Sequence, residues 1–317
     1  DPHSGAYNLP GAVRLSGRLN LPALEQAFAS LVARHETLRT VFQRRADDSL
    51  QQVPVTAPLL IEHVDFSALP AEERERAVAQ TAEQQSLLPF DLSSGPLLRV
   101  TLLKLAEQEH VLLLTLHHIV SDGWSMNVLI YDACDAGTQP NLAPMPIQYS
   151  DYALWQRRWL EAGEQARQLA YWQAQLGDEH PVLELPLDHS RPAMPSYRGT
   201  RYEFAVEAQL AEQLRGTAQK HNITLFMLLL GAFNALLHRY TGQTDIRVGV
   251  PIANRNRAEI EGLIGFFVNT QVLRTRLDGQ TRVDDLLRAI KETSLGAQAH
   301  QDLPFERLVE ALKLERS

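Results

Sequence analysis

A proline-rich segment divides this sequence into two blocks, and it limits the possible folds more than any other feature. Residues 179–198 contain four prolines and show no helical period. Because proline lacks a backbone N–H and fixes φ, such a segment suits neither a helix interior nor a central strand. We therefore expect an N-terminal lobe over residues 1–178, a linker over 179–198 and a C-terminal lobe over 199–317.

The first block alternates strand and helix signals. Alternating or continuous apolar runs predict strands, whereas apolar residues at three- and four-residue steps predict amphipathic helices. The four residues AEQE between the last two strands are short enough for a hairpin. On these signals we expect strands over 11–19, 97–105 and 110–118, and helices over 21–42, 71–88 and 144–176.

The second block repeats this mixture of elements. The segment 224–240 is nearly all apolar, which predicts a helix that is covered on nearly every side. Both blocks then form α+β layers, and a ligand is expected between two such lobes. The remaining elements expected here are strands over 200–206, 245–251 and 271–277, and helices over 211–222 and 282–300.

Charge and cysteine content exclude several classes of function. The net charge is −8 and there is no basic block, so neither a nucleic acid nor an anionic membrane is favoured as a partner. The sequence has no run of about 18 uncharged apolar residues that would span a membrane. Cys134 is the only cysteine, which fits a reducing compartment and predicts a cytoplasmic location.

The stretch HHIVSDGWS at 117–125 follows a strongly apolar run and concentrates polar chemistry. Neighbouring side chains of a strand point to opposite faces, so only one of His117 and His118 is expected to serve a site. Two structural histidines are the ordinary alternative. A metal site is disfavoured, because Gly123 indicates a turn and no second cluster supplies further ligands. The catalytic interpretation needs an exposed imidazole at a strand end.

This stretch resembles the HHxxxDG signature of the condensation domains of non-ribosomal peptide synthetases, which are acyltransferases. Other stretches resemble further motifs of that family, in the family's order. The resemblance implies an α+β fold of two chloramphenicol-acetyltransferase-like lobes, arranged as a V with a central cleft or tunnel. The matching stretches are RHETLRTVF at 34–42, YSDYALW at 149–155, IGFFVNTQVLR at 264–274 and HQDLPFERLVE at 300–310.

The resemblance also implies roles for individual residues. His118 is the catalytic residue, as a general base or as a group that positions the attacking amine, and His117 supports it. Asp122 is expected to pair with an arginine, with Arg255 the first choice and Arg257 the second. Gly123 is expected to let the backbone turn tightly under the substrate.

Other residues of these motifs have a functional and a structural interpretation. Trp124, Ser125 and Asn269 are possible tunnel residues, although Asn269 could equally be a buried strand-edge amide. Structural roles are favoured for a further set. These are Arg34 and Arg39 in surface ion pairs, Gln301 and Asp302 in a helix cap, and Tyr149, Tyr152 and Trp155 in the core.

The implied reaction joins two carrier-bound substrates through a peptide bond. The α-amine of one aminoacyl thioester attacks the thioester carbonyl of a donor aminoacyl or peptidyl group. Both substrates arrive on phosphopantetheine arms of an upstream donor and a downstream acceptor carrier domain, and an adenylation domain is expected nearby. No metal or cofactor is expected to bind this chain.

Three further expectations concern the subtype of condensation domain, the alternative functions and the extent of the chain. The motif wordings favour the subtype that accepts a donor ending in a D-residue. The alternative functions are an epimerisation domain of the same synthetases and a catalytically silent module that recruits partners. The family's first and last motifs have no match here, which predicts an incomplete C-terminal lobe, and residues 128–142 are shorter than the family's usual helix and loop.

Overall fold

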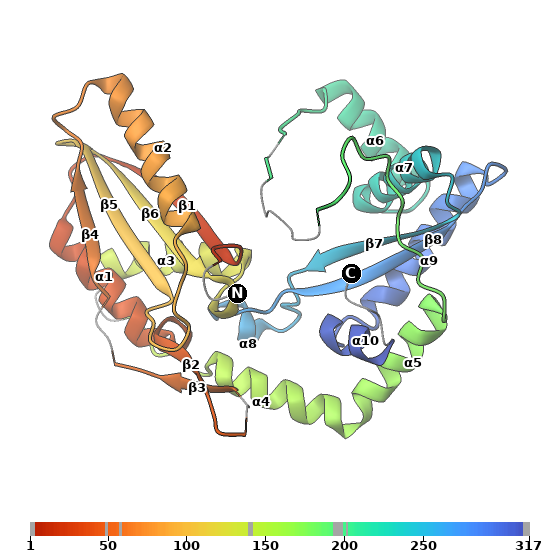
Figure 1. The fold of residues 1–317 in the computed structure, drawn as a ribbon, viewed down its shortest axis with the longest axis horizontal. Coiled ribbons are helices and arrows are strands. Elements are labelled where there is room, and N and C mark those ends of the chain that lie inside the picture. The colour runs from red at the N-terminus through yellow and green to blue at the C-terminus, as the bar shows by residue number, and fades with distance from the viewer. Residues whose placement is uncertain are drawn as a thin grey trace. The chain divides into compact units, whose positions relative to one another are not determined.

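The computed structural model describes residues 4–47, 50–56, 59–138, 142–192, 199–200 and 202–312. The chain forms two compact units (Figure 1). The first contains residues 1–157 and 255–267, and the second contains 158–254 and 268–317. The division therefore differs from the expected lobes. Segment 255–267 belongs to the first unit because its side chains and backbone bind the turn and helix that follow the HH pair.

A four-stranded sheet forms the centre of the first unit (Figure 1). Its order is β1-β6-β5-β4, and only the β4–β5 pair is parallel. The turn Glu107–Gln108 closes the β5–β6 hairpin, as the AEQE link predicts. The strands are β1 (Asn8–Ser16), β4 (Ile61–Asp65), β5 (Leu98–Ala106) and β6 (Glu109–His117).

Helices cover both faces of this sheet. Helices α1 (Leu21–Arg34) and α3 (Gly123–Thr138) pack on the even-numbered residues of β6, such as Leu112 and Leu114. Helix α2 (Ala71–Leu87) packs on the odd-numbered residues, which include Val111. Because successive side chains of a strand alternate between faces, a strand covered on both sides is apolar throughout. That burial explains the run VLLLTL ahead of the two histidines.

The helix expected over 21–42 ends early. Helix α1 stops at Arg34, His35 has extended backbone, and the chain continues as the 3₁₀ helix η1 (Glu36–Arg39) and strand β2 (Thr40–Arg44). Strand β2 pairs with β3 (Leu50–Pro54) in a separate two-stranded sheet. The β-branched residues of TLRTV favour an extended chain, which the helical spacing of the apolar residues concealed.

The long helical segment before the proline-rich region is also interrupted. Helices α4 (Tyr149–Trp159) and α5 (Gln165–Leu176) are joined by the π-type turn Leu160–Glu164. Gly163 in this turn has φ = 116°, which favours glycine. The boundary between the two units falls at this end of α4, between Arg157 and Arg158.

The second unit is built on the antiparallel hairpin of β7 and β8 (Figure 1). Its core contains side chains from α5, α7, α9, α10 and both strands. A strand was expected over 200–206, but residues 202–206 form no strand, so the prediction is wrong there. Arg201 lies outside the described residues. The elements are α6 (Ala208–Lys220), α7 (Leu225–Thr241), β7 (Asp245–Ile252), β8 (Asn269–Arg276), α9 (Val283–Gln298) and α10 (Phe305–Ala311).

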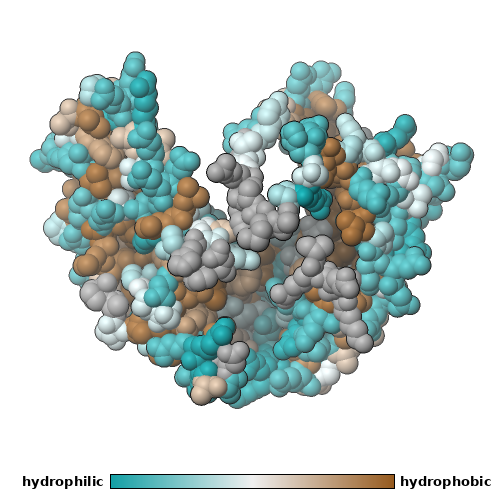
Figure 2. Space-filling view, viewed as in Figure 1, coloured by the Kyte–Doolittle hydropathy of each residue, from teal (hydrophilic) through white to brown (hydrophobic). Residues whose placement is uncertain are grey.

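The prediction that helix α7 is covered on nearly every side is wrong. One face packs on α9, where Gly231 lets the backbone approach Leu287 and Ile290. The opposite face is exposed, because the described hairpin and α9 offer surface for only one side of a helix. Apolar residues reach the surface in both units (Figure 2). Those of α7 are Phe226, Leu229, Phe233, Leu236 and Tyr240.

The described helices include none that is long and apolar enough to cross a membrane alone. Helices α6 and α7 meet the length and composition criterion only as a pair that is bent by 102°.

A charged cluster fixes the end of α5 to the hairpin of the second unit. Arg274 donates to the carbonyl oxygens of Gln175 and Leu176, and Arg247 also donates to Leu176. Both guanidinium groups bind Asp245, at 3.0 Å from Arg247 and 2.7 Å from Arg274. Burial alone would raise the pKa of Asp245, but the hydrogen bonds from Arg274 and Arg247 lower it to about 2.

This cluster predicts a specific loss of stability in acid. A carboxyl group whose pKa falls on folding stabilises the native state above its unfolded pKa, and this contribution disappears as the pH drops through the folded pKa. The Asp245 contribution should therefore decline between about pH 4 and pH 2. Chemical denaturation at successive pH values should show a shallower loss for Asp245→Asn than for the wild type. Identical pH dependence would contradict the assigned role.

Candidate active site

His117 and His118 lie at the point where strand β6 ends and a turn begins. His117 is the last residue of β6, and residues His118–Val120 form a single 3₁₀ turn. Ser121 is extended, and α3 begins two residues later at Gly123. The buried strand thus ends at two partly buried imidazoles, where a turn and a helix N-terminus follow.

The His118 imidazole has a defined tautomer. Its Nδ1 lies 2.9 Å from the carbonyl oxygen of Ser121. A carbonyl oxygen can only accept, so Nδ1 carries the proton and the Nε2 of the neutral ring has a free lone pair. The ring also packs edge-to-face on Phe266, with centroids 5.0 Å apart and an interplanar angle of 84°. These two contacts hold a hydrogen-bond acceptor in a fixed direction.

His117 has the opposite tautomer and different surroundings. Its Nδ1 accepts the backbone N–H of Ile119 at 3.1 Å, so this nitrogen carries no proton. The ring lies near Tyr7 and Phe90, with centroid distances of 6.1 Å to each. Burial, and then the neighbouring His118, lowers the pKa of His117. These contacts make His117 a neutral residue that fixes the turn.

The Asp122 carboxylate is fully buried and accepts hydrogen bonds from four donor groups. Its Oδ1 accepts the backbone N–H of Ser125 at 2.8 Å and the Ser125 hydroxyl at 2.7 Å. The first of these bonds caps the N-terminus of α3. Its Oδ2 accepts the backbone N–H of Phe267 at 3.0 Å. Arg255 Nη2 completes the set, at 3.1 Å from Oδ1 and 3.4 Å from Oδ2.

Arg255 connects this carboxylate to the loop that returns to the first unit. Its Nη1 donates to the carbonyl oxygens of Ile260 and Leu263, both at 2.7 Å. Its side chain is 1% exposed. Burial lowers the pKa of Arg255, and Asp122 opposes that effect. Of the two arginines expected as partners, Arg255 is the one that binds Asp122, whereas Arg257 lies over the Trp155 ring at 4.4 Å.

The three possible tunnel residues have different surroundings. Ser125 is fully buried, and Arg255 donates to its hydroxyl, so its contacts here are structural. Trp124 is 44% exposed, and its Nε1 donates to Glu261. Asn269 belongs to the second unit.

The Asn269 amide is fully engaged in holding the HQDLPFE loop. Its Nδ2 donates to the carbonyl oxygens of Gln301 and Leu303, both at 2.8 Å. Its Oδ1 accepts the backbone N–H of Phe305 at 3.0 Å. The structural interpretation therefore describes Asn269 better than a tunnel role.

Gly123 has a different local environment from the one expected. Its φ is not in the left-handed region, and a Cβ placed on it would meet no atom within 4 Å. The turn itself therefore does not require glycine. The missing side chain instead leaves open space next to the His118 turn.

The RHETLRT motif anchors the same loop from another side. The buried Thr37 hydroxyl donates to the carbonyl oxygen of Ile264 at 2.9 Å. Arg34 pairs with Asp132 at 3.3 Å. Arg39 lies 3.8 Å from Glu36. These contacts are structural, and Thr37 was not among the residues expected from the motif.

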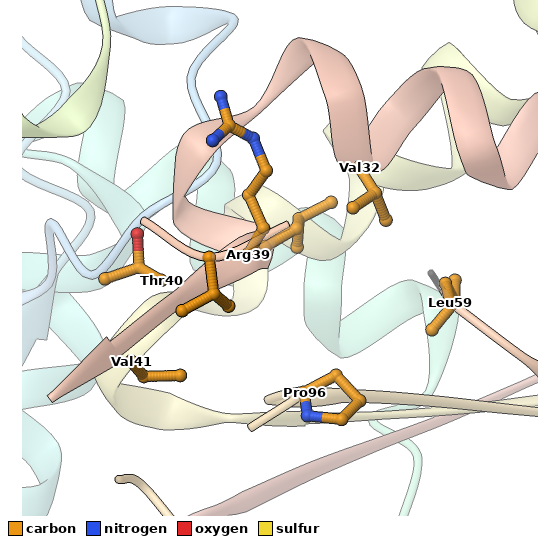
Figure 3. A pocket seen from close by; sticks show the side chains of 8 residues that line it. Val32, Arg39, Thr40, Val41, Leu59 and Pro96 are labelled. Atoms are coloured by element: carbon orange, nitrogen blue, oxygen red, sulfur yellow. The ribbon is translucent and has the colours of Figure 1, made fainter. Parts of the chain in front are cut away.

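The small cavity beside η1 does not change this conclusion. It has a volume of about 10 Å³ and is lined mainly by apolar side chains, which include Val41 and Pro96. The guanidinium group of Arg39 points away from both residues (Figure 3). Such a volume holds at most about one water molecule, so it offers no room for a substrate.

No cluster of three or more metal-binding side chains occurs among the residues that the structure describes.

Comparison with known proteins gives concordant matches along the chain. A family model described as "Condensation domain" matches residues 1–317. A linear gramicidin synthase of Brevibacillus parabrevis is 48% identical over 322 residues, which cover 100% of this chain and 4% of that protein. This chain thus spans only a small fraction of that curated relative.

A solved structure from teicoplanin biosynthesis is also similar. The X-domain is 32% identical with a TM-score of 0.88, and the match covers 98% of this chain and 70% of that chain. The same kind of domain has been solved in complex with OxyB, at 30% identity and a TM-score of 0.84, covering 98% of this chain and 69% of that chain.

The buried ion pair yields a stability prediction. In Asp122→Asn, the new amide NH₂ would face donors in either orientation, because Phe267, Ser125 and Arg255 all donate to the carboxylate. The free energy of unfolding should fall by about 3–5 kcal/mol, as measured by denaturant unfolding. The control Asp285→Asn breaks an exposed 3.1 Å pair with Arg288 and should change stability by less than about 1 kcal/mol. Equal effects of the two variants would contradict a structural role for the buried pair.

Proposed function

The chain belongs to the condensation-domain family, and from that premise we propose that it forms a peptide bond between two substrates presented as thioesters on phosphopantetheine arms. The observation that carries this proposal is the His118 tautomer, with Nδ1 bound to Ser121 and the Nε2 lone pair free. The open space at Gly123 lies next to the same turn. An amine that enters this space has an acceptor for one of its N–H groups.

The proposed reaction balances without a metal or a redox partner. The amine nitrogen of the acceptor attacks the thioester carbonyl of the donor, the new C–N bond forms and the C–S bond breaks. The donor arm leaves as a thiol, and the amine loses one proton. His118 Nε2 serves as the acceptor of an amine N–H, either as a base or as a positioning group.

Positioning can contribute as much as proton transfer. An α-amino group has a reference pKa of about 7.7–8.0, so a useful fraction is already deprotonated near neutral pH. A well-placed general base contributes roughly 10²–10⁴-fold, and favourable orientation contributes about 7–11 kcal/mol. Asp122 takes no part in proton transfer in this proposal, because all its hydrogen-bond partners are donors of the fold.

The proposed partners are two carrier domains and a neighbouring adenylation domain of a larger synthetase. The relation to linear gramicidin synthase supports this setting.

The residues of RHETLRT, HHIVSDGWS and GFFVNT further favour a donor that ends in a D-residue. A carrier assay with matched D- and L-ending donors tests that preference, and faster transfer from the L-ending donor would reject it. That the substrates bind in a cleft between two lobes, as the sequence led us to expect, remains a prediction.

A module that recruits a partner protein is the second candidate. It is favoured by the similarity to the X-domain, which has been solved in complex with OxyB. The oriented His118 and the free space at Gly123 favour the enzymatic proposal instead. An epimerisation domain is not favoured. Peptide-bond formation with loaded carriers separates the two remaining candidates, because a recruiting module would give no product.

Substitution of the two histidines tests the proposed function. His118→Ala should lower single-turnover peptide formation by roughly 10²-fold or more without unfolding the protein. His117→Ala is the matched control, and it should mainly lower the melting temperature, because Ile119 loses its hydrogen-bond acceptor. Equal and mild losses of turnover from both variants would reject these roles.

Substitution of Gly123 tests the proposed approach of the substrate. Gly123→Ala should leave the melting temperature unchanged or higher, since its Cβ meets no atom and alanine favours the helix. Peptide formation should nevertheless fall by roughly 10²-fold, if the Cβ displaces the substrate by about 1 Å. Gly216→Ala in α6 is the control, because its Cβ also meets no atom. Unchanged turnover in Gly123→Ala would show that the substrate does not use this space.

A further inference from the structure

Phe266 differs from its neighbours in the loop that follows Arg255. Ile264 and Phe267 are buried, at 1% and 2% exposure, whereas Phe266 is 37% exposed. A partly exposed aromatic ring gains less from burial than its neighbours do. The ring packs against the His118 imidazole, at 5.0 Å and 84°. It therefore borders the candidate catalytic group.

The backbone around Phe266 is fixed on both sides. Gly265 N–H donates to the Ser125 hydroxyl at 3.1 Å, and Phe267 N–H donates to Asp122 Oδ2 at 3.0 Å. The carbonyl oxygen of Phe266 accepts the hydroxyl of Tyr149 at 2.7 Å. Three consecutive residues are thus bound to the buried network or to α4, so the Phe266 ring has little freedom to move away from His118.

Tyr149 and Gly265 form a matched contact that sets this geometry. A Cβ on Gly265 would lie 2.2 Å from Tyr149 Cδ2 and 2.7 Å from Cε2, so only glycine lets the tyrosine ring lie there. The ring also packs edge-to-face on Phe267, with centroids 5.1 Å apart. Burial raises the pKa of Tyr149, so its hydroxyl keeps the proton that it donates to Phe266.

The His118 imidazole needs such a neighbour. A rotation of about 180° around χ2 exchanges the positions of Nδ1 and Cδ2, which would lose the bond to Ser121 and redirect Nε2. The single hydrogen bond opposes this rotation, and an edge-to-face contact adds to that opposition. The free energy typical of an aromatic pair corresponds to about a twofold to tenfold bias between orientations.

We infer that Phe266 is a positioning residue of the reaction, which Tyr149 and Gly265 hold against His118 so that Nε2 faces the substrate. This inference rests on the proposed function, because it assigns Phe266 a role through His118. Phe266 acts by restricting the imidazole and takes no part in proton transfer. Tyr149 acts one step further away, through the backbone of Phe266.

The inference is tested by two measurements on Phe266→Ala and Phe266→Leu. The ¹⁵N resonances of the imidazole, assigned with His118→Gln, report which nitrogen carries the proton without any turnover. The loaded-carrier assay reports kcat and KM. We expect Phe266→Ala to show a larger fraction of the Nε2–H form or an averaged tautomer, and a roughly tenfold lower kcat with KM changed less than about twofold.

The matched variants isolate the mechanism. Tyr149→Phe removes only the hydroxyl and should shift the tautomer and kcat in the same direction by a smaller factor. Phe226→Ala removes an aromatic ring of similar exposure from α7 and should change neither measurement. Phe266→Leu fills most of the volume without an aromatic face, so it should resemble Phe266→Ala in tautomer while folding like the wild type.

Each result decides the inference separately from the proposed function. An Nδ1–H tautomer that is unchanged in both Phe266 variants overturns the inference, whatever the activity. A shifted tautomer with unchanged kcat also overturns it, because orientation would then not limit the reaction. If His118→Ala keeps full activity, the proposed catalytic role fails, although the tautomer measurement still shows whether Phe266 orients the ring.

Discussion

The ion pair between Asp122 and Arg255 is the interaction on which the candidate site depends. It joins residues 133 positions apart, with side chains 0% and 1% exposed. Two buried charges are expensive to desolvate, so the pair is tolerated only when its hydrogen bonds are well satisfied. The carboxylate receives donors from the α3 N-terminus and from Phe267, and Arg255 donates to the carbonyl oxygens of Ile260 and Leu263.

This network links the His118 turn to a distant loop. Asp122 lies four residues after His118, and the loop it binds carries Phe266 in contact with the His118 ring. A single buried carboxylate thus fixes both the helix that follows the imidazole and the aromatic ring beside it. Thr37 and Tyr149 hold the same loop through the carbonyl oxygens of Ile264 and Phe266. Separate sequence motifs therefore converge on one structural element.

Local sequence patterns predicted the elements whose burial is periodic. The β5–β6 hairpin, helix α2 and helices α6, α7 and α9 follow from apolar spacing and turn residues. The prediction failed where apolar spacing and backbone preference disagree, as at the end of α1, where β-branched residues begin β2. Helix α7 itself was predicted, but its predicted burial was wrong, because apolar composition carries no information about how many sides of a helix its neighbours cover.

The sequence by itself determined the HHIVSDGWS motif and the strand that carries it, because these depend on residues close together in the chain, whereas the catalytic role of His118 is what the family resemblance implies and stays a prediction. It left open which arginine pairs with Asp122, and it did not indicate that Ser125 is fully buried. It offered no sign that Tyr149, Gly265 and Phe266 act together, because its periodicity reports local faces only. Tertiary structure decided these points, because the burial of this loop and the contacts of Tyr149 and Phe266 arise only when segments more than a hundred residues apart meet.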